Sequence, residues 1–268
     1  ISSDGNLGLE EGQKFERGGI YRFTVDVTKG NTKAVLTVEK VGKVDLPAPD
    51  IFFGNDKMEV TDTDIYKSDQ AFTQGQMITV TGIDNLNEWW IDPDFFEKQS
   101  DGALKFLPIN GDYRVTANAV LKYFSVMALK DGKPAKLQDD GTGAIWAIGK
   151  GIGKPSVTSS EVGWEPGKAL CLAQVAPKKY QLTLKAGETL KTSGDPEVIS
   201  FKFFHQNDWG GEFGNYANSI LVEQLKLADS GNLEMQDNKA FEEGAVYRFT
   251  IDVTNGNANA DLKVEKIN

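Results

Sequence analysis

The sequence is poor in the residues on which many catalytic and metal sites depend. Its 268 residues include one cysteine, Cys171, and one histidine, His205. One cysteine excludes an internal disulfide, and one histidine cannot by itself form a zinc site or supply several catalytic bases. Neither residue has a partner visible in the sequence, so both are expected to be structural. Any catalysis would have to rest on carboxylates, and we expect no metal and no cofactor.

Long apolar runs and excess positive charge are also lacking. No run approaches the roughly 20 residues that a membrane helix needs, and residues 1–30 show no secretory signal pattern. The 29 basic and 39 acidic residues give a net charge of -10, which repels nucleic acid and anionic lipid headgroups. The proportions of 40% hydrophobic and 25% charged residues exclude a mainly disordered chain. We expect a soluble globular chain whose targeting segment lies upstream or has been removed.

An internal repeat sets the organisation of the chain. Residues Gly5 to Gly42 align without gaps on Gly231 to Asn268 at a constant offset of 226, and roughly half of the positions are identical. A weaker third copy covers Gly111 to Val126. Identity at this level is far above chance, which makes homology between the copies the economical explanation.

Each copy has the pattern of two antiparallel strands joined by a turn. Apolar and polar residues alternate over 21–27 and 247–253, as in a half-buried strand. The Gly-Asn pairs that follow, at 30–31 and 256–257, tolerate the positive φ of a hairpin turn. Asp92 to Lys98 is the best helical segment. Four further runs are typical of short strands: Met77 to Thr81, Ile145 to Ile148, Lys179 to Leu184 and Val198 to Phe203.

These patterns predict an all-β protein built of tandem antiparallel β-sandwich modules of the Ig-like type. We predict three parts: 1–42 as the C-terminal part of a repeat module, 43–140 as a middle β-sandwich, and 141–268 as a complete third module. Two strands alone are marginal in water. Residues 1–42 are therefore either part of a longer protein or strands shared with a neighbouring module, and the sequence leaves both open.

The third module contains the residues that we expect to bind a ligand. Trp164 and Trp209 stand among Gly, Asp and Asn in turn-like segments, and Lys202 lies on the polar side of a predicted strand. Sugars present flat C–H faces edged by hydroxyls, so a glycan site needs an aromatic platform and a hydrogen-bonding side chain. The alternative is that both tryptophans fill the core, where most large aromatics lie. Composition alone leaves the two readings evenly balanced.

The order of motifs in this module resembles a known family. The strand Ile145 to Gly149, Gly163-Trp164, the strand Phe201 to Phe203 and the stretch Asp208 to Phe213 follow one another as in the starch-binding modules of the SusE and SusF outer-membrane lipoproteins of Bacteroidetes. The resemblance implies a non-catalytic β-sandwich in which Trp164 and Trp209 form an arc for an α-glucan and Lys202 bonds its hydroxyls. It further implies a cell-surface protein, lipid-anchored to the outer membrane through an N-terminal segment missing here, working beside other glycan-uptake proteins.

The middle module offers a second aromatic pair and two carboxylates. It is similar to domains of unknown function that accompany such modules in gut Bacteroidetes. Adjacent Trp89 and Trp90 must point to opposite faces if extended, so one is expected in the core and the other exposed or at a module joint; they form a possible secondary aromatic site. Asp92 and Asp94 could be a glycosidase pair or calcium ligands. A turn residue and a helix N-cap are the favoured roles.

Three functions are therefore weighed for the chain. The preferred one is non-catalytic binding of an oligosaccharide or polysaccharide, most simply an α-glucan such as starch. A structural spacer in a surface glycan-uptake complex is the alternative, and a glycoside hydrolase is less favoured, because only Asp92 and Asp94 present themselves as its carboxylate pair. Binding is preferred over spacing because exposed tryptophans have no other evident purpose.

Overall fold

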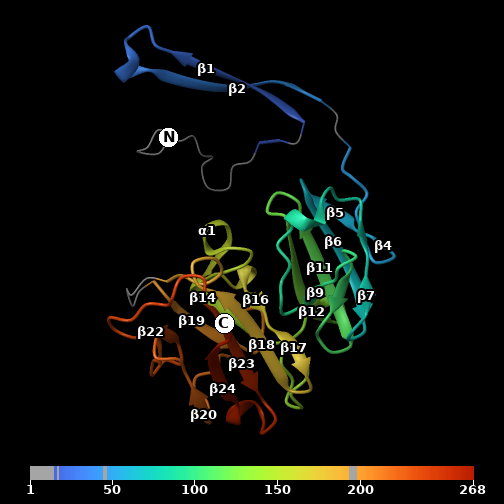
Figure 1. The fold of residues 1–268 in the computed structure, drawn as a ribbon, viewed down its shortest axis with the longest axis vertical. Coiled ribbons are helices and arrows are strands. Elements are labelled where there is room, and N and C mark those ends of the chain that lie inside the picture. The colour runs from blue at the N-terminus through green and yellow to red at the C-terminus, as the bar shows by residue number, and fades with distance from the viewer. Residues whose placement is uncertain (1–14, 17, 45–46, 193–197) are drawn as a thin grey trace.

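The computed structural model describes residues 15–16, 18–44, 47–192 and 198–268, and Figure 1 traces their path. With 47% strand against 6% helix, the prediction of an all-β fold is confirmed. The one α-helix among the described residues is α1, a single turn at Val157–Ser160. The part of the predicted repeat that covers residues 5–14 and 17 lies outside the described residues.

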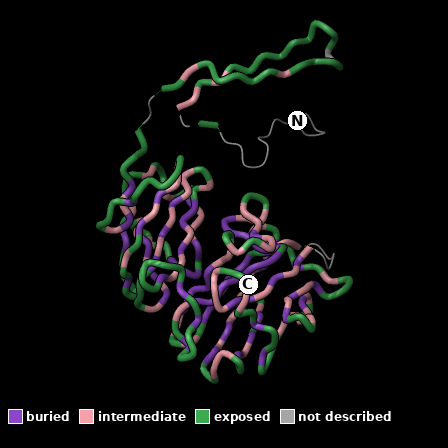
Figure 2. The backbone as a smooth tube through the Cα atoms, turned by 180° about the vertical axis from the view of Figure 1, so that it is seen from behind, coloured by how far each residue is buried: buried purple, intermediate pink, exposed green. Residues whose placement is uncertain are grey.

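The first described element is a hairpin that stands by itself. Its strands are β1 (Gly19–Asp26) and β2 (Val35–Lys43), joined through the 3-10 helix η1 (Asn31–Lys33). Gly30 starts the turn with a φ of 88°, which a residue with a side chain rarely adopts. Within the described part of the chain, β1 and β2 pair only with each other. Figures 1 and 2 show the hairpin apart from the other sheets.

The next part of the chain forms one five-stranded and two three-stranded sheets. The five-stranded sheet has the order β13-β12-β11-β6-β5, and its hairpin β11 (Gly111–Asn118) and β12 (Tyr123–Lys130) contains the third copy of the repeat. The smaller sheets pack aromatic side chains on it, as where Phe53 meets Phe124. The remaining elements are β3 (Phe52–Phe53), β4 (Asp56–Lys57), β5 (Glu59–Asp62), β6 (Ile65–Phe72), β7 (Met77–Ile78), β8 (Val80–Thr81), η2 (Leu86–Glu88), β9 (Phe96–Lys98), β10 (Leu104–Phe106) and β13 (Lys133–Pro134).

Two larger sheets form the C-terminal part. In one, β15-β14-β19-β22-β21 lie side by side and β16 also pairs with β14; the other has the order β17-β18-β23-β24-β20. Phe201 and Phe203 meet Phe249 of the opposite sheet, so the core lies between the sheets, where Figure 2 shows buried chain. The elements are β14 (Trp146–Gly153), β15 (Glu161–Gly163), η3 (Pro166–Lys168), β16 (Leu170–Cys171), β17 (Ala173–Ala176), β18 (Lys179–Lys185), β19 (Ser200–Phe204), β20 (Asn218–Ile220), β21 (Leu225–Leu227), β22 (Leu233–Met235), β23 (Val246–Asp252), η4 (Asn257–Asn259) and β24 (Asp261–Lys266).

The two strong copies of the repeat fold alike. Phe23 pairs with Val38 in β1–β2, and Phe249 pairs with Val264 in β23–β24. These pairs are related by the sequence offset of 226, as are the 3-10 helices η1 and η4 in the two turns. The prediction that both copies form the same hairpin is confirmed for the described residues.

The expected helix at Asp92 to Lys98 is wrong. The Asp92 carboxylate accepts a hydrogen bond from the Asp94 backbone N–H at 3.0 Å, which closes a turn instead. The chain then pairs as β9 with β10, where Phe96 lies opposite Phe106. Because that pairing requires extended backbone, the helix cannot continue, and Asp94 is not the helix N-cap that the sequence suggested.

Candidate functional site

The two predicted tryptophans lie together on the outer face of the six-stranded C-terminal sheet. Side chains of β19 alternate between the two faces of the sheet. Because Phe203 points into the core, the side chains of Lys202 and Phe204 project from the opposite face. The Trp209 ring contacts Phe204 edge-on, with 6.0 Å between centroids. Trp164, which directly follows β15, holds its ring 6.3 Å from that of Trp209 with 24° between the ring planes. The fold therefore brings two distant tryptophans into one aromatic pair.

The loop that carries Trp209 is held by its own hydrogen bonds. The Asp208 carboxylate accepts from the Trp209 backbone N–H at 2.8 Å, and the Gln206 side chain donates to the Trp209 carbonyl. Gly210 and Gly211 follow with φ of 84° and 69°, the left-handed region that favours glycine. The Asp-Trp-Gly-Gly order in the sequence thus reflects a tight turn that presents the indole.

The two rings differ in exposure. Trp209 is 51% exposed, whereas Trp164 is half-buried and packs against the core. Lys202 lies opposite Ile148 of β14, the strand between β15 and β19, which places it two strands, or roughly 10 Å, across the sheet from Trp164. Lys202 thus stands on the same face of the sheet as the aromatic pair.

A hollow that the sequence did not indicate lies beside the loop that carries Trp209. It has a volume of about 470 Å³. Burial lowers the pKa of His205, and among the described residues its Nε2 atom has no hydrogen-bond partner. The lining residues come from three separate stretches of chain, so no local motif announces them: Leu137, Asp139, His205, Glu212, Phe213, Gly214, Asn215, Asn257 and Ala258.

The second predicted aromatic pair lies elsewhere. Trp89 is only 7% exposed and stacks on Phe124 in the core of the middle part. The Trp90 indole N–H donates to Glu188 of the C-terminal part at 2.6 Å, and its ring meets Tyr123 edge-on. One tryptophan is therefore in a core and the other at a module joint, as the alternation of an extended chain requires. Of the four tryptophans in the two pairs, Trp89 is buried, Trp90 and Trp164 are half-buried, and Trp209 is the most exposed.

Asp92 and Asp94, the possible catalytic or calcium-binding carboxylates, meet a buried lysine at that joint. Lys154 donates to Asp92 at 2.8 Å and to Asp94 at 3.0 Å. Asp94 also accepts from the backbone N–H and the hydroxyl of Thr183, both at 2.6 Å, and from the Gln181 side chain at 2.8 Å. All three charged side chains are almost fully buried. The carboxylates thus fasten the middle part of the chain to the C-terminal part.

Charge balance explains how three ionisable groups remain buried there. Burial raises the pKa of Asp92, opposed in part by Lys154. Burial also opposes ionisation of Asp94, but the ammonium of Lys154 and the bonds from Gln181 and Thr183 outweigh it and lower its pKa. The two carboxylates outweigh the desolvation of Lys154 and raise the pKa of its ammonium. The Lys154–Asp94 pair is the charged centre of the joint, and Asp92 is the carboxyl that protonates more readily.

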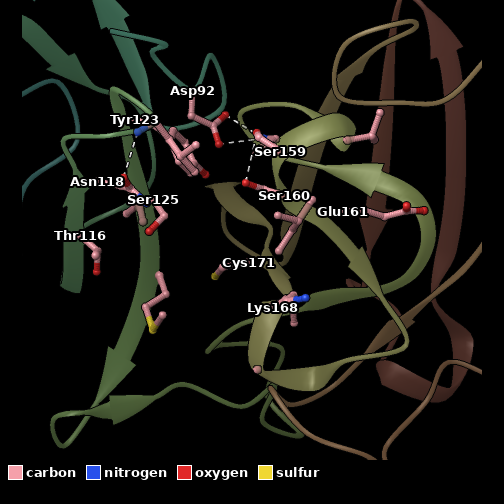
Figure 3. Close-up of a pocket in the computed structure, with 18 of the residues that line it drawn as sticks. Asp92, Thr116, Asn118, Tyr123, Ser125, Ser159, Ser160, Glu161, Lys168 and Cys171 are labelled. Carbon is pink, nitrogen blue, oxygen red and sulfur yellow. Dashed lines mark hydrogen bonds and ion pairs between the residues drawn. The ribbon is translucent and has the colours of Figure 1, made fainter. Parts of the chain in front are cut away.

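A cleft of about 630 Å³ opens beside this joint. Figure 3 shows Thr116, Asn118 and Ser125 on one side and Ser160 and Lys168 on the other. Cys171 also lines it, but burial raises the pKa of the thiol to about 12, which keeps it protonated and unreactive at neutral pH. The described residues contain no group of three or more His, Cys, Asp or Glu side chains placed to hold a metal ion.

Comparison with known proteins places the chain among domains without an assigned function. No curated protein matches it, and none of its described helices is long and apolar enough to cross a membrane. A model for a domain of unknown function, DUF5125, matches residues 44–137. A second such model, DUF5121, matches residues 1–28 and 140–254, stretches that include both copies of the first repeat strand. Since these stretches make up more than half of the 268 residues, the chain belongs to the DUF5121 family.

Proposed function

We propose that the protein binds a polysaccharide without cleaving it, using Trp164 and Trp209 as the platform and Lys202 as the hydrogen-bonding group. The observation that carries this proposal is the aromatic pair itself: a half-exposed indole fixed by a glycine turn beside a second, nearly parallel indole. An exposed indole on a rigid support, beside a second indole, offers a stacking surface for the flat face of a sugar.

The geometry suits a curved sugar chain. Two ring planes inclined by 24° follow a gentle arc, and the apolar C–H faces of successive glucose units in an α-glucan also turn progressively. Each stacked sugar would cover indole surface that is now exposed. Lys202, on the same face of the sheet, would donate to hydroxyls at the margin of this contact, where its bonds compete with water.

The placement of Asp92 and Asp94 supports a role without catalysis. A glycosidase holds its two carboxyl groups on opposite sides of the scissile bond, roughly 5 to 9.5 Å apart. Here both carboxylates bind the same lysine ammonium, at 2.8 and 3.0 Å, and both side chains are buried. A sugar has no place between them, and their lone pairs already accept hydrogen bonds from protein.

The resemblance to the SusE and SusF modules carries the rest of the proposal. It comprises an α-glucan such as starch as ligand, an Ig-like β-sandwich for each module, a lipid-anchored place at the outer-membrane surface, and other glycan-uptake proteins as neighbours. The division into three parts at residues 42 and 140 is also proposed, and it rests on the internal repeat.

Affinity electrophoresis in gels containing soluble starch tests the proposal. Wild-type protein should be retarded and should release no reducing sugar. Trp209→Ala and Trp164→Ala should each lose about 2 kcal/mol or more of binding free energy, roughly a 30-fold weaker affinity. Lys202→Ala should lose about 1 kcal/mol. Phe15→Ala, which removes a 47% exposed aromatic ring that packs on the separate hairpin, is the matched control and should bind like the wild type.

Thermal unfolding separates a binding defect from a folding defect. Trp209→Ala should keep the wild-type melting temperature, because its ring is half exposed; Trp164→Ala should lower it by a few degrees, because its ring packs on the core. Starch retardation that survives both substitutions would place the site elsewhere. Absence of retardation in the wild type would favour the spacer, and release of reducing sugar would favour the hydrolase.

A further inference from the structure

The hairpin β1–β2 exposes an apolar face of the kind that normally lies in a core. Phe23, Val25, Val27 and Val38 are 51%, 61%, 51% and 43% exposed. Strand alternation places Phe23, Val25 and Val27 on one face, and Phe15 packs against Phe23 beside them. A two-stranded sheet with such a face is not stable alone in water and requires a covering surface.

The second copy of the hairpin shows what such a face packs against. The counterparts of Phe23, Val25 and Val38 are Phe249, Ile251 and Val264, whose exposures are 0%, 0% and 3%. Even the aromatic contact at the hairpin entrance is repeated: Phe15 meets Tyr21 at 4.6 Å and 65°, and Phe241 meets Tyr247 at 4.6 Å and 64°. The two hairpins therefore have nearly the same shape and differ in what covers them.

The cover in the second copy has a definite chemistry. β18 pairs along the outer edge of β23 and sets Leu182 opposite Phe249 and Leu184 opposite Tyr247. The facing sheet contributes Phe201, which meets Phe249 with 5.5 Å between centroids. Along the other edge, β20 pairs in parallel with β24. In the hairpin β1–β2, both edges are without a strand partner among the described residues.

We infer that β1–β2 is the closing hairpin of a second DUF5121-type unit. The rest of that unit is a polypeptide segment similar in sequence to residues 143–230. The partner offers an edge strand that alternates apolar residues like Tyr180, Leu182 and Leu184, and an aromatic-rich sheet like that of Phe201 and Phe203. Five of the six core positions of the two hairpins are identical, the exception being Val25 for Ile251; the identical pairs are Tyr21/Tyr247, Phe23/Phe249, Val27/Val253, Leu36/Leu262 and Val38/Val264.

A second copy of this chain is not the occupant. Its residues 143–230 already hold their own hairpin, in which β23 is paired along its full length with β18 and β24. To accept β1–β2, that copy would have to expel β23–β24 and expose the same apolar residues. The exchange replaces one set of contacts by a nearly identical set, so nothing favours it.

A hairpin exchange within the full chain tests whether β1–β2 fits such a surface. The variant carries residues 20–40 in place of 246–266, which requires Val246→Ile, Ile251→Val, Asn255→Lys, Ala258→Thr, Asn259→Lys, Asp261→Val and Lys263→Thr. It should unfold cooperatively within a few degrees of the wild type. The same variant with Phe249→Asp should lose the cooperative transition. Loss of the cooperative transition in the exchange variant that keeps Phe249 would overturn the inference.

A fusion tests the docking itself. A copy of residues 143–230 is joined ahead of residue 1 of the full chain, so that β1–β2 can close it. In limited proteolysis the added segment should be protected in this fusion and in its Thr24→Asp variant, which changes the opposite face of β1, and should be digested at least 10-fold faster with Phe23→Asp. An added segment that is digested as fast in the unchanged fusion as with Phe23→Asp would overturn the inference. So would a dimer of the chain alone, seen by sedimentation equilibrium, that Phe23→Asp abolishes.

Discussion

The hairpins β1–β2 and β23–β24 have similar sequences and the same local structure but different surroundings. They share strand register, the 3-10 turn and the aromatic pair at the entrance. They differ in burial, since Phe23 is 51% exposed and Phe249 is fully buried. Figure 2 shows the contrast directly, with one hairpin drawn almost wholly exposed and the other lying within the C-terminal sheets.

The difference separates two levels of structure. A Gly-Asn turn and alternating residues are enough to specify the hairpin and its register, because those are local properties of the chain. Burial of the apolar face depends on the surface beyond the hairpin. The same contrast applies to ion pairs: Arg22 and Glu39 meet in solvent, whereas Lys154 meets Asp92 and Asp94 in a buried joint.

Truncating the shared phenylalanine should give the largest difference. Phe249→Ala leaves a cavity in the core and should cost about 3 to 5 kcal/mol of unfolding free energy. Phe23→Ala removes an exposed ring and should change the stability of the main fold by less than about 0.5 kcal/mol. Urea unfolding followed by tryptophan fluorescence measures both. Similar losses for the two variants would contradict the separation of local and tertiary effects.

Breaking the ion pairs should give the next largest difference. Lys154→Ala leaves Asp92 and Asp94 buried without their cation and should cost about 3 to 5 kcal/mol, whereas Glu39→Ala breaks an exposed pair worth about 0 to 1 kcal/mol. Calorimetry of both variants measures the effects on unfolding.

Neutralising the carboxylates gives the matching test. Asp92→Asn with Asp94→Asn strands the ammonium of Lys154 and should lower the melting temperature, contrary to a simple turn and capping role. Adding Lys154→Met to that pair removes the last charge and should restore part of the loss. Starch retardation of the folded variants should be unchanged. A double Asn variant as stable as the wild type would contradict the claim that these ion pairs stabilise the joint.

Acid titration should give the smallest difference. Asp26 and Asp252 occupy the same turn position. The backbone N–H of Thr28 lowers the pKa of Asp26; burial opposes ionisation of Asp252, but hydrogen bonds from Thr254 and the nearby Lys179 outweigh it and lower its pKa. A carboxyl group whose pKa is lowered in the folded state stabilises the fold at pH values above its unfolded pKa of about 3.9. This stabilisation is lost as the pH falls through the folded-state pKa.

NMR titration of the two carboxyl groups therefore should place both midpoints below about 3.9. Because Asp252 lies in the packed hairpin, Asp252→Asn should slightly flatten the acid limb of the stability curve of the main fold, and Asp26→Asn should leave that limb unchanged. A normal midpoint for either group would show that its turn is open in solution.

The sequence sufficed wherever structure is set by neighbours in the chain. Periodicity and Gly-Asn turns predicted the strands at 21–27 and 247–253. The alternation of Trp89 and Trp90 predicted one core residue and one that is exposed or at a joint, and the structure places Trp90 at a joint. The sequence failed at Asp92 to Lys98, where a helical composition gave way to strand pairing with β10. It also gave no sign of the hollow beside the Trp209 loop, whose lining comes from three stretches of chain.

The sequence by itself determined the all-β class, the repeat and its hairpins, because alternation and turn chemistry act over a few residues. Only the tertiary structure decided that Trp164 and Trp209 meet, that Asp92 and Asp94 share Lys154, and which hairpin is covered. Those outcomes depend on contacts between residues far apart in the chain. Their free energy comes from burial and charge pairing across sheets, which no local pattern contains.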